Sequence, residues 1–142
     1  MSRIVVVWLH LLGAVVWTGG LLYGSHLVLP RVARGERGYA ALLMRARPVA
    51  WVAVALVVAT GLENLRHVRL DSPWLMAKVL LALILIPLAA HRDFALLPRA
   101  VRAIEQGAAP EPVLGGVRWL DRLIALGLVI VLFLAVGVAR GR

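Results

Sequence analysis

Residues 117–139 read VRWLDRLIALGLVIVLFLAVGVA, and the part from Leu123 to Ala139 contains no charged or amide side chain. An α-helix that crosses a bilayer needs about 20 predominantly apolar residues. Within lipid, only a helix or a closed barrel pairs every backbone N–H and C=O group without water. We therefore expect this segment to cross a membrane as an α-helix.

Three more apolar runs precede it, so the sequence predicts an all-α integral membrane protein with a four-transmembrane-helix antiparallel bundle. The whole chain, residues 1–142, is expected to form a single membrane domain with helices at about 4–29, 48–65, 73–97 and 117–139. Pro30 is expected to end the first helix, Pro48 to open the second and Pro87 to kink the third. The basic segment 31–47 is then a loop or a short surface helix, and 98–116 is the longest loop.

The composition supports this class and excludes several chemistries. Hydrophobic residues make up 62% of the 142 residues and the mean hydropathy is +0.90, which leaves no room for a separate soluble catalytic domain. The absence of cysteine excludes disulfides, iron–sulfur clusters and thiolate copper sites. No catalytic triad, phosphate-binding loop or HExxH zinc motif is present in the sequence.

The formal net charge of +9 comes from arginines that lie between the apolar runs. We interpret them as loop charges that orient the protein and contact anionic lipid, so the expected partner is the lipid bilayer and no nucleic acid. One face carries Arg3, Arg66, Arg69, Arg140 and Arg142, and the other carries Arg31, Arg34, Arg37, Arg45, Arg47, Arg92, Arg99, Arg102, Arg118 and Arg122. The positive-inside rule predicts a multi-pass inner-membrane protein with both termini outside, in the periplasm.

Ionisable side chains within membrane helices are costly and are functional hypotheses by default. His10 lies about six residues into the first helix, which is about 9 Å at 1.5 Å per residue. Lys78 has a comparable depth in the third helix, and Glu63 and His67 end the second helix at i, i+4 spacing. We expect these four residues to form an outer layer of candidate ligands. The simpler interpretation is an ion pair between Glu63 and Lys78, with His67 in contact with water.

A second and weaker layer would lie near the cytoplasmic ends of the first and third helices. It contains His26 and His91. Sixteen residues separate His10 from His26, so the two side chains point about 160° apart on an ideal helix. The two histidines therefore cannot share one narrow seam, and His26 and His91 are equally explained as interfacial or helix-ending residues.

One stripe along the first helix combines a histidine with small residues. His10, Gly13, Trp17, Gly20 and Gly24 follow one another at steps of three and four. Such a stripe is typical of close helix packing in membranes. A second hypothesis is that the glycines let a flat macrocycle approach the backbone while His10 ligates its iron.

Four short stretches resemble known membrane families. They are His10-x6-Trp17-x2-Gly20-Leu21-x-Tyr23, Trp74-Leu75-Met76-Ala77-Lys78, Thr60-Gly61-Leu62 and Leu96-Leu97-Pro98-Arg99. The first two resemble segments of the HemJ-type protoporphyrinogen oxidases. All four are also similar to the membrane domain of the copper resistance protein D family.

This resemblance implies a heme b protein or a copper-handling protein of the inner membrane, with functional weight on His10 and Lys78. Three functions follow as alternatives. The first is a heme-binding oxidoreductase or electron carrier linked to porphyrinogen or quinone, with Gly13, Trp17 and Gly20 beside the cofactor and His67 as an alternative ligand. The second is copper transport or resistance through His10, His67 and Glu63. The third is a helper subunit without a cofactor. A homo-oligomer is compatible with each.

Overall fold

The structure is a computed structural model, which describes residues 2–68 and 70–140. In chain order the helical segments are α1 (Arg3–Tyr23), η1 (Gly24–Val28), α2 (Leu29–Ala33), α3 (Arg37–Leu65), α4 (Pro73–His91), η2 (Arg92–Leu96), α5 (Leu97–Glu105) and α6 (Glu111–Arg140). They join into four rods at Arg3–Ala33, Arg37–Leu65, Pro73–Glu105 and Glu111–Arg140, each long and apolar enough to span a membrane. The predicted all-α, four-helix membrane fold is confirmed.

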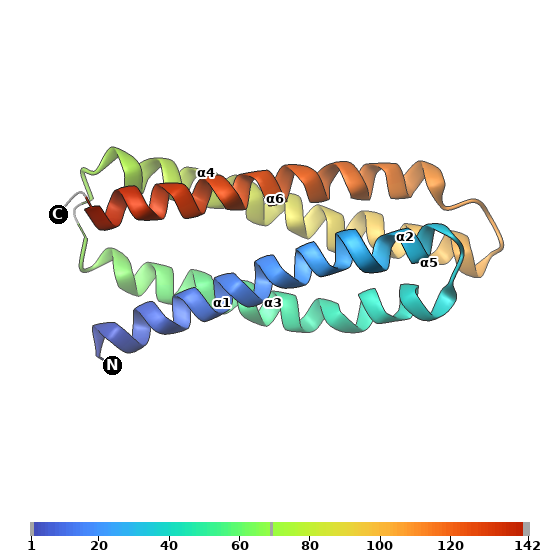
Figure 1. Ribbon diagram of the computed structural model, residues 1–142, viewed down its shortest axis with the longest axis horizontal. Coiled ribbons are helices and arrows are strands. Elements are labelled where there is room, and N and C mark those ends of the chain that lie inside the picture. Colours follow the sequence, from blue (N-terminus) through green and yellow to red (C-terminus); the bar gives the residue numbers. More distant parts are fainter. Residues whose placement is uncertain (1, 69, 141–142) are drawn as a thin grey trace.

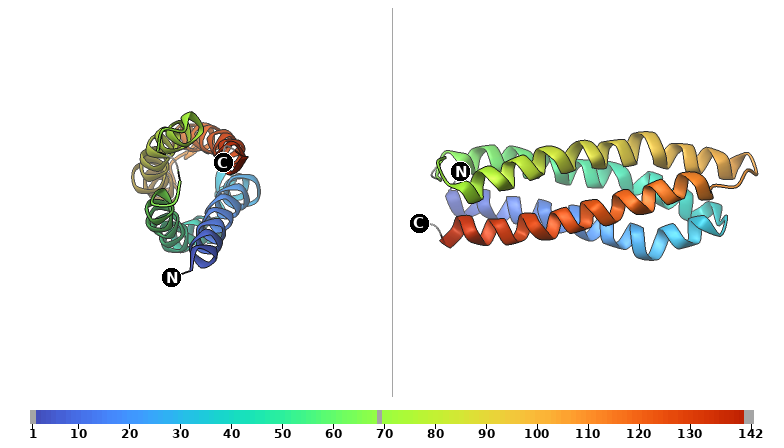
Figure 2. Two further views of the ribbon diagram at one scale, coloured as in Figure 1. Left: turned by 90° about the vertical axis from the view of Figure 1, so that its left-hand side faces the viewer. Right: turned by 90° about the horizontal axis from the view of Figure 1, so that it is seen from above.

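The rods form two helical hairpins that lie side by side (Figures 1 and 2). The first hairpin pairs α1 with α3, and the second pairs α4 with α6. The start of α1, the end of α6 and the adjoining ends of α3 and α4 lie at one end of the bundle, called here the termini end. The turns at 34–36 and 106–110 lie at the opposite, arginine-rich end, where Gly35 and Gly107 have positive φ angles of 80° and 71°. Glycine adopts such angles at no steric cost.

The structure corrects several predicted boundaries at the arginine-rich end. Pro30 does not end the first rod, which continues to Ala33, and Pro48 lies inside α3, which begins at Arg37. The expected long loop over 98–116 is mostly helical and shrinks to residues 106–110. These rods run for 29–33 residues, or about 45–50 Å, which exceeds the hydrocarbon thickness of about 30 Å. The additional turns therefore extend beyond the apolar layer.

The prolines are tolerated because the helix widens before them. Each of the segments η1 and η2 is a π-helical turn, and each is followed by Leu-Pro-Arg, at Leu29–Arg31 and Leu97–Arg99. Pro30 and Pro98 occupy the first turn of the next α segment, where no helical N–H is required. The wider turn relieves the clash that a proline ring makes with the preceding carbonyl.

These two Leu-Pro-Arg segments reveal a repeat that the sequence did not make evident. They are separated by 68 positions, and His10 and Lys78 are separated by the same 68 positions. Each half of the chain consists of a rod with a π-helical turn, a glycine turn and a second rod. His10 and Lys78 thus occupy equivalent places in the two hairpins.

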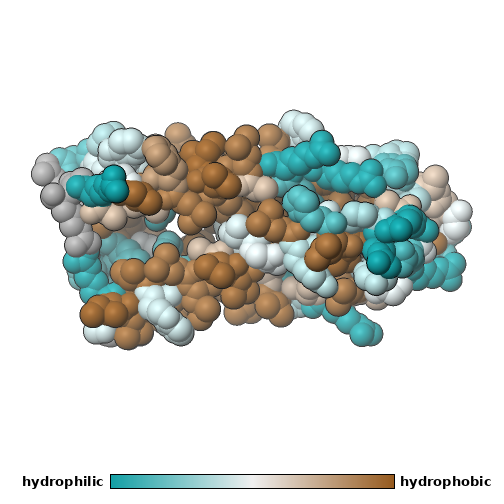
Figure 3. Space-filling view, in the orientation of Figure 1, coloured by the Kyte–Doolittle hydropathy of each residue, from teal (hydrophilic) through white to brown (hydrophobic). Residues whose placement is uncertain are grey.

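Buried side chains connect the hairpins in the middle and at the arginine-rich end. One cluster includes Trp17, Val54, Leu85 and Ile124, and the other includes Val32, Leu97 and Leu114. Towards the termini end the described buried residues are few, namely Val6, Gly13, Thr60 and Leu75, and none belongs to either cluster. Figure 3 shows the surface hollowed between the hairpins in this half, with apolar residues around the hollow.

Close contact between α1 and α3 depends on Gly13. A Cβ atom at this position would lie 2.9 Å from Val57 Cγ2 and 3.0 Å from the main-chain oxygen of Ala53. Gly19 and Gly20, on the same helix, would meet nothing within 4 Å. Because a backbone oxygen cannot move aside as a flexible side chain does, Gly13 sets how closely these helices approach.

We predict that Gly13→Ala lowers the free energy of unfolding by about 1–3 kcal/mol, the usual cost of overpacking. Gly19→Ala is the matched control on the same helix, and it should leave the stability unchanged or slightly higher because alanine favours helix. Thermal unfolding of the detergent-solubilised variants measures both. Equal stability of the two variants would contradict the packing role of Gly13.

Candidate functional site

His10 is held in one orientation by the neighbouring helix. Its Nδ1 atom lies 3.0 Å from the main-chain oxygen of Val57 and 3.0 Å from Thr60 Oγ1. The Thr60 hydroxyl donates its own proton to the main-chain oxygen of Leu56, at 2.5 Å. Both partners of Nδ1 are therefore acceptors, so Nδ1 carries a proton, and the neutral form of this imidazole is the Nδ1–H tautomer. The Nε2 atom then bears the lone pair that a metal ion would bind.

Gly61 leaves the space that this imidazole occupies. A Cβ atom there would lie 3.3 Å from His10 Cε1, which is closer than most side-chain contacts. Thr60 and Gly61 therefore act together, since one accepts a hydrogen bond from the ring and the other makes room for it. The Thr60-Gly61 pair on α3 therefore fixes the position of the His10 ring on α1.

Lys78 approaches the same region from the second hairpin. It is half-buried on α4, 68 positions after His10. Among the described residues, no hydrogen bond or ion pair to Lys78 is present. His10 and Lys78 thus occupy equivalent places in the two hairpins.

The other two residues of the expected outer layer do not join them. Glu63 pairs with Arg66 through Oε2 and Nη1 at 2.9 Å rather than with Lys78, and His67 is exposed. Within residues 2–68 and 70–140 no three His, Cys, Asp or Glu side chains gather as a metal-binding group. The prediction that all four residues converge inward is wrong for Glu63 and His67.

The residues of the stripe on α1 lie in different surroundings and do not line one common site. Gly13 is filled by α3 and leaves no slot for a macrocycle, which corrects that interpretation. Trp17 is buried in the central cluster. Gly20 does border open space, but it lies ten residues, or about 15 Å, from His10. It lines a different cavity, described below.

The inner histidines do not form a site. His26 is exposed, and its Nδ1 lies 3.0 Å from the main-chain oxygen of Leu22 on the same rod. His91 is exposed as well. No described contact joins His26 to His91, so the weaker second metal site expected at these residues stays a prediction.

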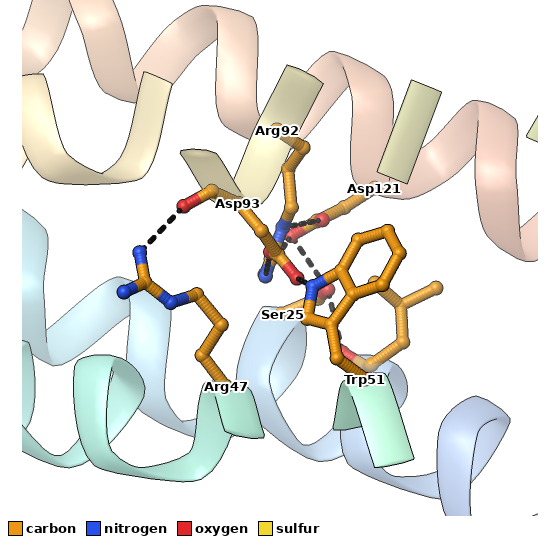
Figure 4. Close-up of polar contacts among 7 residues, drawn as sticks. Ser25, Arg47, Trp51, Arg92, Asp93 and Asp121 are labelled. Carbon is orange, nitrogen blue, oxygen red and sulfur yellow. Dashed lines mark hydrogen bonds and ion pairs between the residues drawn. The ribbon is translucent and has the colours of Figure 1, made fainter. Parts of the chain in front are cut away.

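A buried polar network lies where that second site was expected (Figure 4). Arg92 donates to both carboxylate oxygens of Asp121, from Nε at 2.7 Å and from Nη2 at 3.3 Å. Its Nη1 atom donates to Asp93 Oδ1 at 2.5 Å. The side chains of Arg92, Asp93 and Asp121 are at most 10% exposed. Two carboxylates thus share one buried guanidinium.

Both helices of the first hairpin also bind this network. Ser25 donates to Asp121 Oδ2 at 2.7 Å, and Trp51 Nε1 donates to Asp93 Oδ2 at 3.0 Å. Arg47 Nη1 donates to the main-chain oxygen of Asp93 at 3.2 Å. All four rods therefore meet at one set of hydrogen bonds, and no buried side-chain polar atom of the described residues is left unpaired.

A cavity of about 270 Å³ adjoins this network. Its walls come from α1 and α3, and Ala89, Arg92 and Asp93 form the floor. Gly20 and Gly24 lie on the α1 side, and Arg47 lies on the α3 side. The cavity is thus apolar along its length and polar at the floor.

Sequence reasoning missed the network, although one signal was available. Asp121 is the one acidic residue of the segment 117–139, and a buried carboxylate needs a cationic partner. The charge pattern alone counts Arg92 among the loop arginines, whereas the π-helical turn places Arg92 and Asp93 inside the bundle as buried residues. The correct partner becomes visible only when α4 and α6 are packed together.

Comparison with protein-family models, curated proteins and solved structures gives no match to this chain.

We predict that Asp121→Asn lowers the free energy of unfolding by about 3 kcal/mol, because it leaves Arg92 with one carboxylate instead of two. Glu111→Gln is the control, since Glu111 and Arg118 form an exposed pair that should contribute less than about 1 kcal/mol. Chemical unfolding in detergent micelles compares them. Similar small losses in both variants would show that the network contributes little to stability.

Proposed function

We propose that this protein is a heme b-binding membrane oxidoreductase or electron carrier, with the Nε2 atom of His10 as an axial ligand. One observation carries the proposal: Nδ1 donates to the main-chain oxygen of Val57 and to Thr60, so the ring is held in one orientation and Nε2 is the nitrogen that bears the lone pair in the neutral imidazole. Metal-ligating histidines almost always have their second ring N–H bonded in this manner. The short resemblance at His10 and Lys78 agrees with it.

The surroundings of His10 fit a flat apolar cofactor. The described buried clusters connect the hairpins elsewhere, and the surface is hollowed between them in this half (Figure 3). A bound heme would supply one-electron chemistry. The residues of the chain would hold the imidazole through Thr60 and leave room for it at Gly61. Quinone in the bilayer is the proposed electron partner, with a porphyrinogen as the other candidate substrate.

Lys78 is the proposed group on the other side of the cofactor. It holds the place equivalent to His10 in the second hairpin, and among the described residues nothing else pairs with it. Ligation requires the neutral amine, whereas a charged Lys78 would pair with a heme propionate. His67, the alternative ligand, is exposed at the end of its helix and is the weaker choice.

No observation favours the copper alternative. Its three proposed ligands are separated by the fold, because Glu63 is paired with Arg66 and His67 is exposed while His10 faces α3. A helper subunit without a cofactor would not require the two hydrogen bonds that hold the His10 ring. Both alternatives are outcomes of the following test.

We predict that protein expressed with ample heme shows a Soret band that disappears in His10→Ala. His26→Ala is the matched control on the same rod and should keep the band, because His26 is exposed and bonded to its own helix. Thr60→Val should retain heme but bind it roughly tenfold more weakly, as expected for a lost partner of a ligating histidine. Visible spectra and heme content of the purified proteins measure these effects.

A band that survives in His10→Ala would end this assignment. Colourless wild-type protein that binds copper would favour the copper alternative, and colourless protein that binds neither would favour the helper subunit. The same preparations therefore separate the three functions.

The proposed location is the inner membrane with both termini in the periplasm. Among the described residues the arginine-rich end carries ten arginines and the termini end carries Arg3, Arg66 and Arg140, while Arg69 and Arg142 lie outside the described residues. The end with the larger number belongs in the cytoplasm. We predict that reporter fusions at Arg37 and Gly107 report the cytoplasm, since both positions lie at or beside the turns of the arginine-rich end. Periplasmic signals from both fusions would reverse the orientation.

A further inference from the structure

The cavity beside the polar network opens towards the membrane. Its rim includes Val16, which is 39% exposed, and Val49, which is 61% exposed, on two helices that face lipid. Gly20 adds open space, because a Cβ atom there would meet nothing within 4 Å. The slot therefore continues from the lipid-facing surface to the charged floor.

Arg47, on the α3 side of the cavity next to this floor, is the lining cation that no carboxylate of the described residues binds. Among the described contacts, its guanidinium donates one hydrogen bond to the main-chain oxygen of Asp93 and lies 5.0 Å above the Phe94 ring. Arg92 differs, because Asp93 and Asp121 both bind it. The remaining N–H groups of Arg47 are free to bind an anion, and the planar guanidinium suits phosphate in particular.

The depth of the cavity matches the headgroup region. Arg92 lies 19 residues after Pro73, or about 28 Å along the helix, which is close to the hydrocarbon thickness of about 30 Å. The segments 31–47 and 92–122 contain ten arginines and five acidic residues, a net charge of +5. Anionic lipid headgroups are attracted to such a surface.

We infer that the groove between α1 and α3 binds one anionic phospholipid, with its phosphate on Arg47 and an acyl chain along the apolar slot past Gly20. This lipid matches the groove in shape and in charge. The acyl chain fits the apolar slot, and the phosphate fits the Arg47 guanidinium that no carboxylate binds. The inference is independent of the proposed cofactor, which would lie in the other half of the bundle.

Titration of the delipidated protein with phosphatidylglycerol, followed by native mass spectrometry, tests this site. Arg47→Gln removes the cation, and Gly20→Leu fills the slot without changing any charge. Each should weaken binding of the tightest lipid by at least roughly tenfold, as the loss of charge-assisted hydrogen bonds or of the acyl-chain slot implies.

Two matched controls distinguish a site from general attraction. Arg45→Gln removes an exposed arginine at the same end, and Gly19→Leu adds the same side chain on the same helix outside the cavity. Both should bind phosphatidylglycerol as the wild type does. An equal loss in Arg45→Gln would overturn the proposal, and so would equally tight binding of phosphatidylcholine or of a benzoquinone.

Discussion

Arg92 lies at the centre of the bundle, because Arg92, Asp93 and Asp121 are hydrogen-bonded to one another and to residues of the first two rods, so that all four rods take part. Asp121 comes from α6, Ser25 from the first rod, and Trp51 and Arg47 from α3. A charge buried inside a protein is costly unless a partner neutralises it, and removal of one partner costs more than the pair contributes. The two hairpins are therefore held at one register. Sliding either of them would separate these groups.

The network divides the bundle into two halves that differ in how tightly the hairpins pack. On the arginine-rich side of the network, Val32, Leu97 and Leu114 close the space between the hairpins. On the termini side the described residues form no comparable cluster, and the surface is hollowed (Figure 3). A bundle fixed firmly at one level and open at another can hold a flat cofactor without losing its alignment.

The repeated π-helical turns explain how both halves are positioned. Each precedes a Leu-Pro-Arg segment, and each places its residues at the network: Ser25 lies in η1, and Arg92 and Asp93 lie in η2. The equivalent positions carry different side chains. One hairpin contributes a hydroxyl and an imidazole, and the other contributes a guanidinium, a carboxylate and an amine. The similar backbone thus presents unlike groups across the space between the hairpins.

The sequence by itself determined the number of membrane helices and the level of His10 and Lys78, because apolar length and residue spacing along a helix are local properties. It also indicated His10 as a costly group in lipid. Only the tertiary structure decided what each side chain meets. Gly13 was filled by α3, Glu63 paired with Arg66, and Asp121 found Arg92, since rotation and register between helices depend on packing of all four. The helix boundaries predicted from the prolines were wrong, because a π-helical turn before Pro30 and Pro98 lets the rod continue. This adjustment of the backbone is not specified by the preference of any single residue.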